Sequence, residues 1–133
     1  MLGLDTNVLA RIVLRDDAVQ SPAALKRVAS AIAQGIPVVV GLPTLLELDW
    51  VMRSYGKLTK QERLHIFTHL LETKDLRIDG EAVLEVALHQ WENSDADFAD
   101  CLFLAQYQRM GCDTMLTFDA KAARMTGVAL VAG

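Results

Sequence analysis

Five carboxylates in this sequence share one property: each lies at the end of a predicted strand or in the first turns of a predicted helix. They are Asp5, Glu47, Asp97, Asp100 and Asp119. If the strands are parallel and belong to one sheet, their carboxyl ends face the same edge, and the acids meet there. Two carboxylates ~4 Å apart repel by roughly 1 kcal/mol in water and about 4 kcal/mol at an effective dielectric of 20, so such a cluster calls for a cation. Oxygen-only ligands suit Mg²⁺ or Mn²⁺, and a site of this kind supports hydrolysis of a phosphodiester.

Short apolar runs alternate with longer stretches of helical periodicity along the chain. Strands are predicted over residues 1–4, 36–40, 76–78, 113–117 and 128–131, and helices over residues 7–14, 22–34, 45–55, 60–72, 81–91, 97–110 and 120–125. Strands separated by helices require crossover connections, so we expect a parallel sheet that is covered on both faces. The sequence therefore predicts a single α/β domain over residues 1–133, in which a parallel five-stranded sheet is sandwiched by helices in three α/β/α layers.

Composition sets the protein class but leaves the partner open. The chain has 133 residues, of which 52% are hydrophobic, enough for one domain with a generous core. A net charge of −4 is unlike the basic footprint of most nucleic-acid binders, although acids gathered on a metal leave the remaining surface close to neutral. We expect a cytoplasmic protein without a membrane contact, because no apolar run reaches the ~20 residues of a spanning helix and no secretory signal opens the chain.

Each acid also has a purely structural interpretation. Asp5 and Asp119 precede helices and suit the N-cap position, and the helix macrodipole favours Asp97 without any catalytic purpose. Thr44 and Glu47 have the capping-box spacing, yet the helix around Glu47 is apolar nearly all round, so we expect this carboxylate to be partly buried against a partner. The separate structural roles do not explain why all the acids converge on one predicted edge.

Other polar residues carry weaker signals. Asp49 points to the opposite side of its helix from Glu47, and we expect it to be structural. His65 and His69 have the spacing of zinc ligands, but residue 66 is Ile, so the H-E-x-x-H pattern fails and we expect surface histidines.

A group of basic residues surrounds the bend between two predicted helices. These residues are Arg53, Lys57, Lys60 and Arg63. They are either ordinary solvated charges or a strip that contacts a phosphate backbone beside the acidic site. We expect the aromatic residues to belong to the core, and therefore no aromatic platform for stacking of bases.

Four segments in order carry a family resemblance: LDTNVL at the start, the apolar helix with Glu47, DFADCL, and the ending TFD. Together they resemble the PIN-domain nucleases and, within these, the VapC-type toxins of prokaryotic toxin–antitoxin pairs. The resemblance implies a PIN-like five-stranded parallel sheet and an Mg²⁺- or Mn²⁺-dependent ribonuclease that acts on RNA. It also implies a homodimer, and an antitoxin protein that blocks the site.

The resemblance assigns roles by matching position. It implies that Asp5, Glu47, Asp100 and Asp119 are catalytic and metal-binding acids, that Asp97 is a further metal-binding acid, and that Thr6, Asn7 and Thr117 are supporting hydrogen-bonders. We predict an endoribonuclease, the toxin of a type II toxin–antitoxin system. Two alternatives remain: an RNA- or protein-binding module without catalysis, and a small metal-dependent phosphatase. The D-x-D signature of the phosphatases has Asn7 in place of its second acid.

Overall fold

Each predicted strand is found in the computed structural model, which describes residues 1–131. The strands are β1 (Leu2–Gly3), β2 (Val38–Val40), β3 (Leu76–Ile78), β4 (Met115–Thr117) and β5 (Val128–Leu130). All of their pairings are parallel, as the alternation of strands and helices predicted. The α/β class is confirmed.

Hydrogen bonds group the strands into a three-stranded sheet, β1-β2-β3, and a two-stranded sheet, β4-β5. In the first sheet Val38 pairs with Leu2 on one side and with Leu76 on the other, and in the second Met115 pairs with Val128. The prediction of one five-stranded sheet differs from this pairing. The chain forms two compact units, Met1–Glu81 with the first sheet and Ala82–Gly133 with the second, and each is described by itself.

The helices lie close to their predicted positions. They are α1 (Thr6–Leu14), α2 (Gln20–Ala33), α3 (Leu42–Ser54), α4 (Lys60–Glu72), α5 (Glu81–Glu92) and α6 (Phe98–Arg109). The helix predicted over residues 120–125 is a single 3₁₀ turn, η1 (Ala122–Arg124), because the backbone is already extended at Met125 on the way to β5. No helix within residues 1–131 combines the length and apolar character that crossing a membrane requires.

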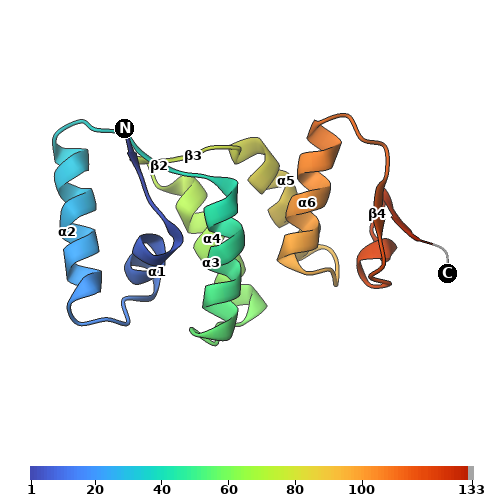
Figure 1. The fold of residues 1–133 in the computed structure, drawn as a ribbon, viewed down its shortest axis with the longest axis horizontal. Coiled ribbons are helices and arrows are strands. Elements are labelled where there is room, and N and C mark those ends of the chain that lie inside the picture. Colours follow the sequence, from blue (N-terminus) through green and yellow to red (C-terminus); the bar gives the residue numbers. More distant parts are fainter. Residues whose placement is uncertain (132–133) are drawn as a thin grey trace. The chain divides into compact units, whose positions relative to one another are not determined.

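In the first unit, α1 packs against both α2 and α3, while α4 packs against α3 and β3 (Figure 1). Leu9, Leu45 and Met52 are fully buried between these helices, and Val38 on the central strand is buried as well. A reciprocal capping box at Thr59 starts α4, with its partner Glu62. This packing joins the start of α1 to the middle of α3, which are the segments that carry Asp5 and Glu47.

In the second unit, α6 and the β4-β5 sheet carry the remaining acids. Trp91 of α5 packs edge to face on Phe98 of α6, with ring centroids 5.2 Å apart, and Cys101 and Leu104 continue the buried face of α6. Both strands pack against η1. The start of α6 is thereby anchored to a rigid core, which holds the acids of its first turn in place.

Candidate functional site

Three of the five predicted acids lie together in the second unit. Oxygen atoms of Asp97, Asp100 and Asp119 all lie within 4.8 Å of one another. Asp97 is the N-cap of α6, Asp100 lies in the first turn of that helix, and Asp119 follows β4. Residues that are 19 positions apart in sequence (Asp100 and Asp119) therefore meet through the tertiary structure, as the sequence pattern predicted for this part of the acid set. We call these three residues the acidic triad.

The negative charge of the triad affects the pKa of Asp100. Its pKa is raised above the ordinary value by burial of the carboxyl, and further by the negative charges of Asp119 and Asp97, while Lys121 acts in the opposite direction. The N-terminus of α6 favours negative charge, but desolvation and two neighbouring carboxylates outweigh that effect here. The nearby positive charge of Lys121 therefore does not balance the negative charge of the three carboxylates.

Short hydrogen bonds orient the exposed members of the triad. Asp119 Oδ1 accepts from the backbone N–H groups of Lys121 and Ala122, at 2.8 and 3.3 Å, and so holds the turn that leads into η1, although the N-cap residue of η1 is Lys121 and not Asp119. The Thr117 hydroxyl oxygen accepts from the backbone N–H of Asp119 at 3.0 Å and fixes the turn after β4. The ammonium of Lys121 lies 3.2 Å from Asp97 Oδ1, a contact that nothing in the spacing of these residues indicated.

The donor set of the triad fits a divalent cation. It offers only carboxylate oxygens, on two elements whose backbones are held by other contacts, at separations that one ion can bridge. Hard, oxygen-only coordination is the preference of Mg²⁺ and Mn²⁺ rather than of zinc. A cation there would also relieve the repulsion that raises the pKa of Asp100.

The other two predicted acids lie in the first unit, around the start of α1. Asp5 is the N-cap of α1, and its Oδ1 accepts from the backbone N–H of Val8 at 2.9 Å. The hydroxyl of Thr6 donates to Glu47 Oε1 at 3.1 Å. Asp5, Thr6, Asn7 and Glu47 line one pocket of about 560 Å³, which we call the α1–α3 pocket. The structure thus describes the predicted acids as two groups, one in each unit.

The structure corrects one expectation about α3 and excludes one structural interpretation of Glu47. Glu47 is exposed rather than partly buried, and it is not part of a capping box, because Gly41 occupies the N-cap position and Thr44 lies inside the helix. The buried acid of this helix is Asp49, which forms an ion pair with Arg63 of α4. An almost uniformly apolar helix does not reveal by periodicity which side faces the core, and this is why the exposure of Glu47 was missed.

The predicted basic strip contains one buried residue and three that reach the surface. Arg63 is buried with Asp49, so it serves the packing of α3 on α4. Arg53 and Lys57 are exposed, and Lys60 is half-buried at the start of α4. His65 and His69 are exposed, as predicted.

Two aromatic residues that were expected in the core are exposed beside the first group of acids. Trp50 is 50% exposed and Tyr55 is 70% exposed, and both line the α1–α3 pocket. Their rings form an edge-to-face pair with centroids 5.4 Å apart and an interplanar angle of 79°. One sequence signal points to Trp50: it lies three residues after Glu47, so the two side chains share one face of the helix, and a candidate site acid on that face indicates that Trp50 lies beside the site.

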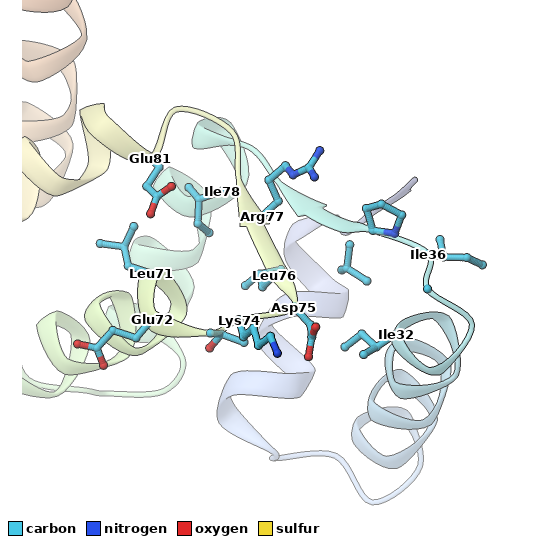
Figure 2. A pocket seen from close by; sticks show the side chains of 14 residues that line it. Ile32, Ile36, Leu71, Glu72, Lys74, Asp75, Leu76, Arg77, Ile78 and Glu81 are labelled. Atoms are coloured by element: carbon cyan, nitrogen blue, oxygen red, sulfur yellow. The ribbon is translucent and has the colours of Figure 1, made fainter.

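A different pocket of the first unit lies at the other edge of its sheet, where β2 and β3 begin (Figure 2). Its volume is about 470 Å³, and its side chains come from the end of α4, from β3 and from the segment before β2. Acidic and basic side chains alternate around it, among them Glu72, Lys74, Asp75 and Arg77. This mixture resembles neither a cation site nor a phosphate site, so we place no function there.

The model of the family described as PIN domain matches residues 3–128, which is nearly the whole chain. No curated protein matches this sequence.

Proposed function

Since this chain belongs to the PIN-domain family, whose members are typically metal-dependent nucleases, we propose that it is an Mg²⁺- or Mn²⁺-dependent endoribonuclease that hydrolyses RNA phosphodiester bonds. The observation that carries the proposal is the acidic triad, three carboxylates within 4.8 Å of one another in a chain of a nuclease family. The raised pKa of Asp100, caused first by burial and then by the neighbouring acids, supports the same assignment.

Within this proposal, Asp97, Asp100 and Asp119 would hold the cation. Asp5 and Glu47 are further catalytic and metal-binding acids of the first unit. Family membership and the position of each acid at a strand end or helix start support these roles. Thr6 and Thr117 orient Glu47 and Asp119 through the hydrogen bonds described above, and Asn7 lines the pocket of the first group.

A divalent cation bound by these carboxylates supplies charge that activates a water molecule and stabilises developing charge on the phosphoryl oxygens. The chain's own residues set the geometry. Asp119 is fixed through its Oδ1 by two backbone N–H groups, and Asp100 is fixed by the buried face of α6. Lys121, whose ammonium contacts Asp97, would moderate the negative charge of the site.

The decisive experiment maps cleavage sites in total RNA with Mg²⁺, with Mn²⁺ and with EDTA. We expect cleavage with either cation and none with the chelator. Asp5→Asn and Asp100→Asn should each lower cleavage by at least about 100-fold while circular dichroism remains that of the folded chain. Asp113→Asn, an exposed acid of the second unit outside the triad, is the matched control and should cleave normally. Full activity in EDTA contradicts the proposal.

We also propose the biological setting that the motif resemblance implies: a cytoplasmic toxin of the VapC type, in a type II toxin–antitoxin pair, that forms a homodimer and is blocked by an antitoxin protein. LDTNVL, DFADCL and TFD in this order support it. Induced expression should arrest growth, co-expression of the protein encoded by a short adjoining gene should relieve the arrest, and Asp100→Asn should not arrest growth at all. Growth arrest that persists in the Asp100→Asn variant favours a binding module without catalysis. Turnover of a small phosphomonoester, with RNA left uncut, favours a phosphatase.

A further inference from the structure

The exposed aromatic pair Trp50 and Tyr55 has no role in the proposed metal chemistry. Both rings line the α1–α3 pocket together with Asp5 and Glu47. Large aromatic side chains contribute most to stability when they are buried, yet these two are 50% and 70% exposed. Two exposed rings that pack on each other at the wall of a pocket are a surface prepared for a ligand.

We propose that Trp50 and Tyr55 form a stacking platform for an unpaired nucleobase of the RNA strand, beside Asp5 and Glu47. The inference rests on the proposed nuclease function, because it assigns the substrate contact beside the same acids. In an edge-to-face pair the two rings do not cover each other's faces completely, and Trp50 and Tyr55 remain 50% and 70% exposed, so ring surface is available to a base. Stacking on aromatic rings is the usual way in which proteins hold single-stranded RNA, since every base offers a π-face.

The geometry of α3 relates the platform to the acids. Glu47 and Trp50 are three residues apart, which places their Cβ atoms about 5–6 Å from each other on one helix face. A base that stacks on Trp50 therefore lies within about one nucleotide of Glu47. Tyr55 follows at the C-cap of the same helix and supports the Trp50 ring from the side.

The charges of the pocket favour a base over a phosphate at this wall. Asp5, Asp16 and Glu47 line the pocket, whereas its cation, Arg11, is already bound to Asp16 at 3.1 Å and to Gln20 at 2.8 Å. The uncompensated charge is therefore negative, which repels a phosphate but not an uncharged base.

Basic residues alternate with the two rings along the chain and fit the strand that leads away from the pocket. Arg53 lies between Trp50 and Tyr55, and Lys57 follows Tyr55, held with a positive φ of 54°. Both are exposed, and within residues 1–131 neither is found in an ion pair. Alternation of aromatic and cationic side chains is typical of grooves that bind single strands, whereas it disfavours a cationic peptide as the occupant.

The two tryptophans allow a direct test in the full chain, in EDTA so that no RNA is cut. Trp91 is only 2% exposed, so quenching of emission by acrylamide reports on Trp50. We expect a short single-stranded RNA of mixed sequence to protect Trp50 from acrylamide, and an abasic strand of equal length to give no protection. Protection by both strands, or by neither, overturns the platform.

Substitutions supply the second arm. Trp50→Ala should weaken RNA binding by about 5- to 150-fold, the range for loss of one base stack, and should raise KM for cleavage more than it lowers kcat. Trp50→Phe should restore most of the binding. Tyr107→Ala removes a similarly exposed ring from α6, outside the pocket, and should bind RNA normally.

The outcomes separate the platform from the proposed function. If the wild-type protein cuts RNA and Trp50→Ala leaves KM and RNA binding unchanged, the platform is overturned and the nuclease proposal stands. Base-dependent protection of Trp50 without any cleavage contradicts the nuclease and leaves the platform intact. If Trp50→Ala instead shifts a monomer–dimer equilibrium in sedimentation while RNA binding stays the same, the pair is a protein contact and the platform is overturned.

Discussion

The hydroxyl of Thr6 donates a hydrogen bond of 3.1 Å to Oε1 of Glu47, and so connects the first turn of α1 to the middle of α3. Both residues belong to the same pocket as Asp5. The bond uses one oxygen of Glu47 and thereby restricts the rotamers of an exposed side chain that otherwise moves freely. Residues that orient a metal-binding or catalytic acid in this way usually contribute to activity without touching the substrate.

Thr6→Val removes this donor and keeps the shape of the side chain. Loss of such an orienting bond typically lowers metal affinity or activity by about 10- to 100-fold, so we expect kcat/KM for RNA cleavage to fall at least about 10-fold. Thermal unfolding should be nearly unchanged. Thr68→Val is the matched control, because its hydroxyl donates to the backbone carbonyl of Leu64 within α4, away from the acids. Equal activity of both variants would show that Glu47 needs no orientation.

Asp49 and Glu47 lie two residues apart on α3 and differ in burial. Asp49 forms a buried ion pair with Arg63, whereas Glu47 is exposed. Asp49→Ala removes one partner of a buried pair and should lower the free energy of unfolding by about 3–5 kcal/mol. Glu47→Gln should change it by less than about 0.5 kcal/mol while abolishing cleavage. Urea unfolding followed by circular dichroism measures both, and a stable Asp49→Ala variant would contradict the assignment.

The pH dependence of stability follows from Asp100. Because the pKa of its carboxyl is raised in the folded chain, the folded state binds this proton more tightly than the unfolded state. Above pH 3.8, the ordinary value, the metal-free protein therefore loses stability as pH rises through the folded pKa of Asp100. Asp17, whose pKa is lowered by backbone N–H groups of α2, acts in the opposite sense and only below pH 3.8.

Urea unfolding in EDTA at a series of pH values measures this effect, with emission of Trp91 as the probe in a Trp50→Phe background. Asp100→Asn should remove the loss above pH 3.8, and Mg²⁺ should reverse it in the wild type. An identical pH profile in the variant would mean that the triad carries no excess charge in solution.

Lys121 competes with a cation for Asp97. Its ammonium lies 3.2 Å from the carboxylate, and both side chains are close to half exposed. Lys121→Met removes a positive charge from the edge of the triad, so Mn²⁺ should bind more tightly in calorimetric titration. Exposed pairs contribute about 0.2–1 kcal/mol, which limits the gain to roughly five-fold. Weaker binding by this variant would assign Lys121 a supporting role instead. Arg124→Met, which disrupts a longer contact of 3.9 Å to Asp95, serves as the control.

The sequence by itself determined the elements and the chemistry of the acids. Thr59 and Glu62 start α4, and Asp5 starts α1, because capping depends on residues that are neighbours in the chain. The β-branched run at β2 and the alternation of strands with helices likewise predicted a parallel α/β fold from local information. Carboxylates at strand ends and helix starts were therefore recognisable before any contact was known.

Only the tertiary structure decided which side of α3 faces the core. That helix is apolar nearly all round, so its periodicity could not tell that Asp49 is buried while Glu47 and Trp50 are exposed; the packing of α3 against α1 and α4 determines it. The contact of Lys121 with Asp97 and the bond of Thr6 to Glu47 join residues 24 and 41 positions apart. No local pattern encodes such distances, because they depend on how the elements pack rather than on how each one forms.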